Sequence, residues 1–99
     1  GIPPKLPNGK YECILFNMEG KKIVVAHWWD PALTKKSGIF EQYDTTGVLR
    51  ISCYYDNNQL NGLFKTWYET GIMSDSGNMK KNMADGIWES WYPSGQKKD

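Results

Sequence analysis

The stretch Gly38-Ile-Phe-Glu-Gln-Tyr-Asp-Thr-Thr-Gly47 recurs twice further along the chain. Its copies are Gly62-Leu-Phe-Lys-Thr-Trp-Tyr-Glu-Thr-Gly71 and Gly86-Ile-Trp-Glu-Ser-Trp-Tyr-Pro-Ser-Gly95. The first glycines of successive copies are 24 residues apart, and the two glycines within each copy are 9 apart. A constant period indicates one supersecondary unit copied along the chain. Repeat arrays usually present an extended binding surface, so the period bears on function as well as on fold.

Each copy predicts a β-hairpin. In Tyr92-Pro93-Ser94-Gly95 the proline suits a type I turn, and the glycine suits the left-handed residue that completes a three-residue loop. Return turns are expected between copies, at Ser37-Gly38, Asn61-Gly62 and Asp85-Gly86. The predicted strands are 39–44, 48–55, 63–68, 72–79 and 87–92, with a further return strand at 21–29. The structural turn residues are Gly38, Gly47, Gly62, Gly71, Gly86, Pro93 and Gly95.

The fold class that follows is all-β. We predict an antiparallel meander of about four hairpin repeats, with seven or eight strands, that forms an elongated, curled, single-layer sheet. The 99 residues form one domain. Its parts are an N-terminal tail at 1–7, a degenerate first hairpin with its loop at 8–37, repeats at 38–61 and 62–85, and a final truncated repeat at 86–99.

Composition narrows the functional classes. Twelve Lys and Arg residues against eleven Asp and Glu give a formal charge of +1, which argues against a nucleic-acid binder, since such proteins usually carry a basic excess. No run of 18 apolar residues is present to span a membrane as a helix. Cys13 and Cys53 are expected on strands roughly 14 Å apart, whereas a disulfide needs Cα atoms within about 7 Å. We therefore expect two free thiols.

The repeated pattern resembles the MORN repeat variant found in bacterial proteins, many of which are labelled antitoxin components of toxin–antitoxin systems. The resemblance rests on Gly-x-[Phe/Trp]-x-x-[Trp/Tyr]-Tyr-x-x-Gly in three copies, covers 38–99 well and extends loosely to 8–37. It implies a hairpin sheet that associates with proteins or lipids, and no enzymatic activity is established for the repeat itself. Asp44 departs from the pattern, since it replaces the tyrosine of the other copies.

Hairpin register predicts two faces of different content. If Tyr68 pairs with Ile72, then Trp67 faces Met73, Lys65 faces Asp75 and Phe64 faces Ser76. The expected packing face carries Ile39, Tyr43, Leu49, Ile51, Cys53, Leu63, Trp67, Met73, Ile87 and Trp91. The opposite face carries aromatic residues among Gln42, Arg50, Ser52, Thr66, Ser74, Ser76 and Ser90.

The aromatic residues of the opposite face are the candidate binding residues. They are Phe40, Phe64, Tyr68, Trp88 and Tyr92. One interpretation is a ladder of rings that holds neighbouring strands together. The other is a binding strip, because rigid amphipathic rings are common interface anchors, with sugar stacking as a variant. Both interpretations remain open at this point.

A catalytic interpretation is centred on His27 and Asp30, which could act as an acid–base pair. The chain has no second histidine, no recognisable nucleophile setting and no phosphate-binding loop, and one His with two separated Cys is too few ligands for a metal. The sequence therefore predicts no catalytic residue, no metal site and no cofactor, so the chain is expected not to be an enzyme.

Protein association is the favoured function, with a partner whose identity the sequence leaves open. The alternative ligands are anionic lipid and, through the aromatic strip, carbohydrate. Lysine pairs at 21–22, 35–36, 80–81 and 97–98 could attract the lipid, or they could instead keep strand edges from pairing with other chains. A homodimer could form through the exposed C-terminal strand at 87–92. The start at Gly1, without a methionine, fits a chain whose targeting segment has been removed or one that has been trimmed. The first interpretation favours an extracytoplasmic location over a cytoplasmic one, and the second leaves the compartment open.

Overall fold

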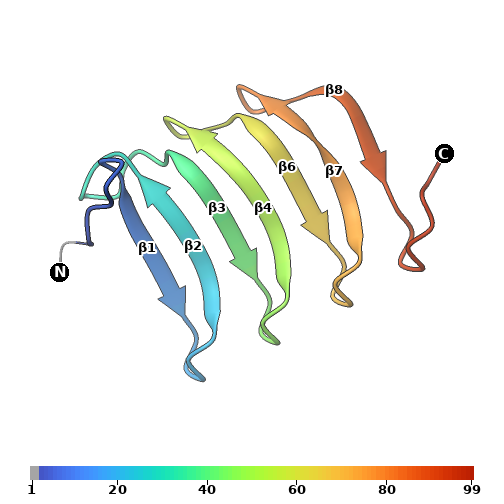
Figure 1. Cartoon of the computed structure of the whole chain (residues 1–99), viewed down its shortest axis with the longest axis horizontal. Coiled ribbons are helices and arrows are strands. Elements are labelled where there is room, and N and C mark those ends of the chain that lie inside the picture. Colours follow the sequence, from blue (N-terminus) through green and yellow to red (C-terminus); the bar gives the residue numbers. More distant parts are fainter. Residues whose placement is uncertain (1–2) are drawn as a thin grey trace.

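The computed structural model describes residues 3–99, which form one antiparallel sheet (Figure 1). Gly1 and Ile2, at the start of the predicted tail, lie outside the described residues. The sheet order is β1-β2-β3-β4-β6-β7-β8, and the short β5 pairs with β4. The strands are β1 Tyr11–Phe16, β2 Lys22–Trp28, β3 Gly38–Tyr43, β4 Leu49–Asp56, β5 Gln59–Leu60, β6 Gly62–Trp67, β7 Met73–Lys80 and β8 Met83–Ser90. The prediction of an all-β meander is confirmed.

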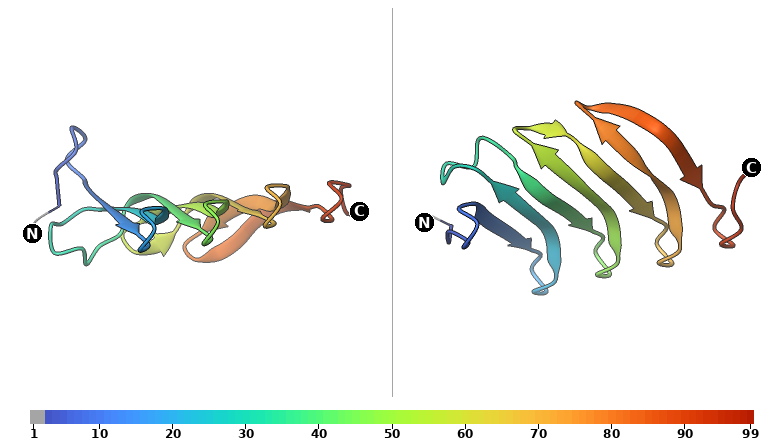
Figure 2. Two further views of the ribbon diagram at one scale, coloured as in Figure 1. Left: turned by 90° about the horizontal axis from the view of Figure 1, so that it is seen from below. Right: turned by 45° about the horizontal axis from the view of Figure 1, so that its top comes forward.

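The sheet is a single thin layer. Its extents are 46 × 35 × 19 Å, and the edge-on view in Figure 2 shows no second layer over either face. The buried hydrophobic residues within 3–99 are Val25, Ala26 and Cys53. Stability therefore has to come from contacts between neighbouring strands on the faces of the same sheet.

All four hairpin loops share one set of backbone hydrogen bonds. In the third loop, the Gly71 N–H donates to Tyr68 O at 2.9 Å, and the Tyr68 N–H donates to Ile72 O at 2.8 Å. Equivalent bonds close the loops at 17–21, 44–48 and 92–96. The glycine of each loop has a φ between 83° and 94°, a left-handed conformation that glycine adopts without steric cost. The first hairpin thus has the same loop as the clear copies.

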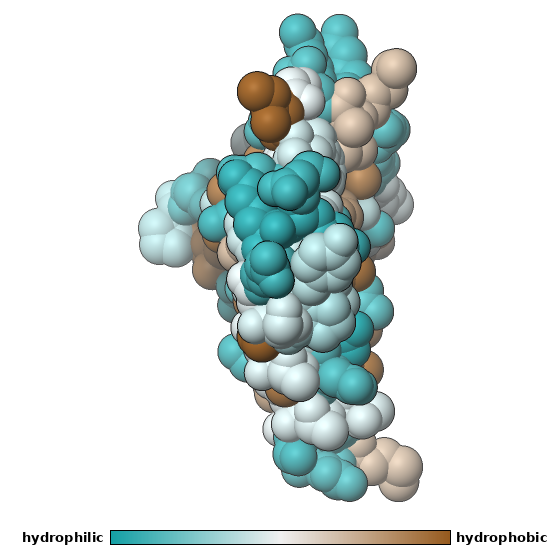
Figure 3. Space-filling view, turned by 90° about the vertical axis from the view of Figure 1, so that its right-hand side faces the viewer, coloured by the Kyte–Doolittle hydropathy of each residue, from teal (hydrophilic) through white to brown (hydrophobic). Residues whose placement is uncertain are grey.

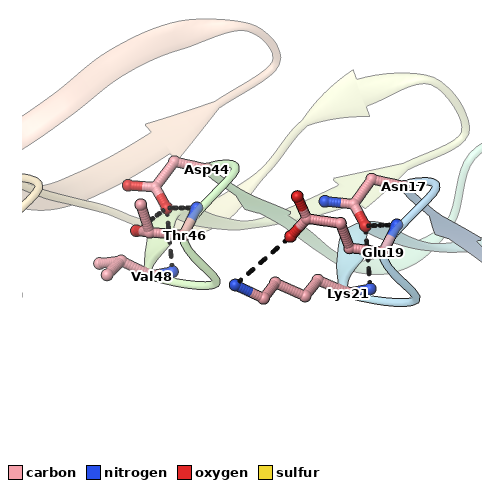
Figure 4. Close-up of polar contacts among 6 residues, drawn as sticks. All are labelled: Asn17, Glu19, Lys21, Asp44, Thr46 and Val48. Carbon is pink, nitrogen blue, oxygen red and sulfur yellow. Dashed lines mark hydrogen bonds and ion pairs between the residues drawn. The ribbon is translucent and has the colours of Figure 1, made fainter.

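The first two loops are also closed by the side chain of their first residue (Figure 4). Asp44 Oδ1 accepts hydrogen bonds from the N–H groups of Thr46, at 2.9 Å, and Val48, at 3.1 Å. Asn17 Oδ1 accepts from two N–H groups of its own loop, at 2.9 and 3.0 Å. The Thr46 hydroxyl also donates to Asp44 Oδ1. This hydrogen bond first, and then those from the N–H groups of Thr46 and Val48, lower the pKa of Asp44. Asp44 therefore caps its turn, where Tyr68 in the next repeat supplies an aromatic side chain.

A β-bulge follows the loop in each of the first three hairpins. Trp67 pairs with Met73, as predicted, but the next pair is Thr66 with Asp75, so one residue of the return strand has no partner across the hairpin. The same skip occurs in the pairs β1–β2 and β3–β4. The skipped residues are Ile23, Arg50 and Ser74.

The bulge makes the predicted register wrong by one residue beyond it. Lys65 pairs with Ser76 and not with Asp75, and Phe64 pairs with Gly77 and not with Ser76. Side chains alternate between the two faces along a strand. Beyond the bulge, each residue of the return strand therefore lies on the face opposite to the one predicted for it.

Two faces can now be defined from the pairing. Phe40 pairs directly with Cys53, so Cys53 and its neighbour-but-one Ile51 lie on the face of Phe40, and not with Ile39 as expected. We call the face of Phe40, Phe64 and Trp88 the aromatic face. The other face, which carries His27, Ile39 and Tyr54, is the histidine face.

The aromatic face packs by placing a ring on a small residue of the preceding repeat. A Cβ atom built on Gly77 would lie 2.1 Å from the Trp88 ring, so the ring rests directly on the Gly77 backbone. The equivalent small residues in the earlier repeats are Ala26 and Cys53, and both are buried. The rings that follow them in the repeat are Phe40 and Phe64. The largest ring, Trp88, is therefore matched with the smallest residue.

The chain reverses between repeats earlier than predicted. Asn57-Asn58 and Lys81-Asn82 each have two successive positive φ values, which is the pattern of a type I′ turn. The predicted Asn61-Gly62 and Asp85-Gly86 follow these turns, and their glycines have φ values of 109° and 71°. The short β5 and the first residues of β8 extend the hairpins up to these turns.

The second residue of each return turn also joins neighbouring repeats. Asn58 Oδ1 accepts from the Lys36 N–H at 2.7 Å, and the Asn58 N–H donates to Lys36 O at 2.9 Å. Asn82 makes the same two bonds to Leu60, at 2.7 and 2.9 Å. A repeated asparagine thereby satisfies backbone groups of the preceding repeat.

A fifth copy of the hairpin loop lies before β1. The Gly9 N–H donates to Leu6 O at 2.9 Å, the Leu6 N–H donates to Lys10 O at 2.7 Å, and Gly9 has a φ of 86°. The predicted first repeat begins at residue 8, and the structure gives Asn8-Gly9 the geometry of a hairpin loop. Figure 2 shows this segment rising from one side of the sheet.

We expect Gly77→Ala to destabilise the protein by about 2 kcal/mol, because the added methyl group collides with the Trp88 ring. Urea unfolding measures the change. Trp88→Phe should rescue part of the loss, since phenylalanine faces alanine or cysteine in the other repeats. A double variant no more stable than Gly77→Ala alone would contradict this packing.

We expect the Cys53 thiol to be inert in the folded protein. Burial raises its pKa from 9.0 to about 11, and the thiolate is the reactive form. At pH 8 a thiol reagent should modify Cys13, which is partly exposed, and reach Cys53 only after unfolding. The unfolded chain also releases this proton first, so stability should fall as the pH rises from about 9 towards about 11. The fall should be smaller in Cys53→Ala, and equal reactivity of both native thiols would contradict the assignment.

Candidate functional site

The predicted aromatic binding residues lie on the aromatic face in contact with neighbouring strands. Phe40 in β3 meets Tyr55 in β4 edge to face, with ring centroids 5.6 Å apart. The centroids of Phe64 in β6 and Trp88 in β8 are 5.9 Å apart, across Gly77. The Trp88 indole N–H donates to a carbonyl of β7 at 3.1 Å. These contacts have the geometry of the ladder interpretation.

The two tyrosines of the set differ in exposure. The Tyr68 hydroxyl donates to Trp91 O at 2.6 Å and so ties the third hairpin to the fourth. Tyr92 is half exposed, and its ring lies 5.2 Å from the ammonium of Lys98. Tyr92 is therefore the most open of the five predicted residues, and a binding role for the set stays a prediction.

At its N-terminal end the aromatic face is occupied by a lysine of the same chain. The Lys36 ammonium lies 4.8 Å from the ring centroid of Tyr55, 5.4 Å from Phe40 and 5.7 Å from Trp28. Such contacts attract a cation to the faces of the rings. Leu60 occupies the equivalent position of the next repeat, so the position of Lys36 is one where a side chain packs against the sheet. The methylene stem of Lys36 provides this packing, and its ammonium lies over the three rings.

The histidine face carries apolar residues that sequence reasoning assigned to packing. Ile39, Leu63 and Ile87 occupy one position in successive repeats and are 39%, 43% and 91% exposed. Tyr54, directly across from Ile39, is also exposed. We call these four residues the apolar row. They remain open because no second layer covers this face, and the available signal was that three of them directly follow the first glycine of a repeat.

The apolar row is interrupted by polar side chains and does not form one continuous hydrophobic patch. Asn78 in β7 stands across from Leu63, so a polar side chain lies between Leu63 and Ile87. Figure 3, seen from the β8 side, shows single hydrophobic residues set among hydrophilic ones. Such a surface stays compatible with solvent while offering spaced apolar contacts.

His27 is held by two acceptors. Its Nδ1 lies 2.8 Å from Ile39 O, and its Nε2 lies 3.0 Å from a carboxylate oxygen of Glu12. Both bonds form together when both ring nitrogens carry hydrogen. The expected partner Asp30 is used elsewhere: it caps its own loop, and hydrogen bonds led by the Thr34 hydroxyl lower its pKa. The structure therefore does not assemble the His27–Asp30 pair, and the His27 ring is positioned as a structural link between strands.

A hollow opens beside His27, between the loop before β1 and residues of β2, β3 and β4. It has a volume of about 220 Å³ and is lined by Asn8, Lys10, His27, Gly38, Ile39 and Tyr54. The loop before β1 forms one wall and the start of the apolar row forms the other. A Cβ atom on Gly38 would lie 3.1 Å from the Cβ of His27 and 3.4 Å from the Lys10 ammonium, so the glycine keeps the hollow open.

Within residues 3–99, no group of three or more His, Cys, Asp or Glu side chains is placed to hold a metal ion. The same part of the chain contains no helix that is both long and apolar enough to cross a membrane.

Comparison with known proteins gives a family match for two segments of the repeat array. The family model described as MORN repeat variant matches residues 36–57 and 84–98, which confirms the resemblance at two segments. These segments contain β3 with β4 and most of β8 with the final loop. No curated protein and no solved structure gives a match. MORN repeats are generally associated with protein or membrane binding and with non-catalytic roles.

Proposed function

We propose that this chain is a non-catalytic module that holds a protein partner against the histidine face of its sheet. The apolar row carries the proposal, because the same position of three successive repeats is apolar and exposed. Exposed apolar side chains at a constant spacing suit a partner that extends along the array. The antitoxin label of similar proteins implies such a partner, and an envelope role is also compatible with this surface.

A protein partner is favoured over an anionic membrane because five of the eight lysines in the recurring pairs are engaged within the chain. Lys22, Lys36 and Lys98 lie over aromatic rings, and Lys21 and Lys97 pair with carboxylates. Polybasic membrane binding depends on several ammonium groups free to approach the lipid. Pelleting with anionic vesicles at low salt would favour the membrane instead.

Two finer possibilities concern other surfaces. Tyr92, as the open ring of the aromatic face, is the residue on which a sugar could stack. A second copy of the chain could pair along β8, whose residues Met83 to Ile87 are all exposed. A molar mass of two chains by light scattering, lost when Ile87 is replaced by proline, would support the homodimer.

The partner can be sought with a photo-cross-linking amino acid at position 87, and with the same group at position 18 as a control. Met18 is exposed and apolar and lies in a hairpin loop away from the apolar row. We expect a cross-linked protein in the native cell from position 87 and not from position 18. A shared set of products would mark non-specific contact.

With the partner purified, Leu63→Ser combined with Ile87→Ser should weaken binding about tenfold or more, because two anchors of the row are lost. Calorimetry measures the affinity, and Met18→Ser is the matched control. Ile87→Ser alone should leave the free energy of unfolding within about 0.5 kcal/mol, since the side chain is exposed. Unchanged affinity in the double variant with a loss in Tyr92→Ala would move the binding site to the aromatic face.

A further inference from the structure

The hollow beside His27 has an unusual charge arrangement. None of the ion pairs formed within residues 3–99 involves Lys10, whose ammonium lies at the hollow and 5.1 Å from the centroid of the Trp29 ring. The nearby carboxylate of Glu12 is already paired with His27. Within the described chain the Lys10 ammonium is therefore open to a carboxylate that comes from outside.

The wall opposite the lysine is apolar. Ile39 and Tyr54 line it, and both also belong to the apolar row that continues across the sheet. At about 220 Å³ the hollow is smaller than the roughly 300–1,000 Å³ of sites for drug-sized ligands, so it suits a group the size of a single amino-acid end.

We propose that the hollow binds the C-terminal carboxylate of a partner protein, with the last side chain of that partner, an apolar one, against Ile39 and Tyr54. The proposal rests on the proposed function, since it specifies how a protein would begin its contact with the apolar row. A chain end carries a carboxylate and an apolar side chain on one carbon atom, which matches an ammonium beside an apolar wall. An internal acidic residue presents its carboxylate alone.

The geometry around the lysine is fixed by the fifth loop. The Lys10 N–H donates to Asn8 Oδ1 at 2.9 Å, and the Lys10 carbonyl accepts from the Leu6 N–H at 2.7 Å. This backbone is held in place before a ligand arrives, so little ordering is needed on binding. Gly38 has a φ of 118° and leaves the space that a side chain would fill.

N-acetyl-leucine is the probe, because it reproduces a chain end with an apolar last residue. We expect it to shift the backbone amide NMR signals of the hollow, and Lys10→Gln to weaken its binding about tenfold, as the loss of a charged hydrogen bond would. Lys22→Gln is the matched control, since Lys22 also lies over an aromatic ring, that of Tyr43, near the hairpin edge. Its affinity should equal that of the wild type.

Two further ligands separate the alternatives. N-acetyl-leucinamide, which has no charge, should not bind, and the α-amide of N-acetylglutamate, whose carboxylate is on the side chain, should bind at least about tenfold more weakly than N-acetyl-leucine. Equal binding of all three ligands, or no shift with N-acetyl-leucine, overturns the proposal. These measurements need no partner, so the hollow can fail while Leu63 and Ile87 still bind a protein, and the apolar row can fail while the hollow still binds N-acetyl-leucine.

Discussion

The structure depends on seating a ring on a small residue of the preceding repeat. A single-layer sheet has no opposing layer to exclude water from its faces, so side chains on one face have to cover one another. Trp88 on Gly77 is the closest instance, with no room for even one carbon atom between ring and backbone. Ala26 and Cys53 repeat the arrangement with smaller rings following them. The single layer therefore explains both why the sheet is stabilised by rings packed on small residues and why its faces stay exposed.

The same thinness shapes the binding surfaces. The rings of the aromatic face pack against neighbouring strands, and the Lys36 ammonium covers the rings at one end of this face. The histidine face has less to pack against and leaves the apolar row open. A hollow forms where the regular pattern stops, because the loop before β1 leaves the plane of the sheet and forms a wall. Regular repeats supply a flat surface, and their irregular boundary supplies a concave one.

Sequence reasoning predicted the hairpins and the meander because glycine spacing constrains the backbone directly. It did not predict the bulges at Ile23, Arg50 and Ser74, since these residues share no type that would mark an extra position. That single omission moved Cys53 and Ile51 to the wrong face and hid the exposure of Ile39 and Leu63. The return turns at Asn57-Asn58 and Lys81-Asn82 could have been predicted from their asparagines, because Asn58 and Asn82 are 24 residues apart. The turns were instead predicted at the glycines that follow, Gly62 and Gly86. The hollow could not be foreseen, because it depends on how the first residues fold back.

The asparagine contacts between repeats have a consequence for the length of the array. Asn58 and Asn82 each bond to the repeat before them, and the Trp88 ring packs on the repeat before it, so these contacts join neighbouring units. A unit of 24 residues could be added or removed in the middle without disturbing the N-terminal loop, provided that ring and small residue stay matched in size. Each added unit would also lengthen the exposed apolar series by one residue. The length of partner that such a sheet can contact therefore depends on the number of repeats. The strength of binding would rise with the number of repeats that the gene encodes.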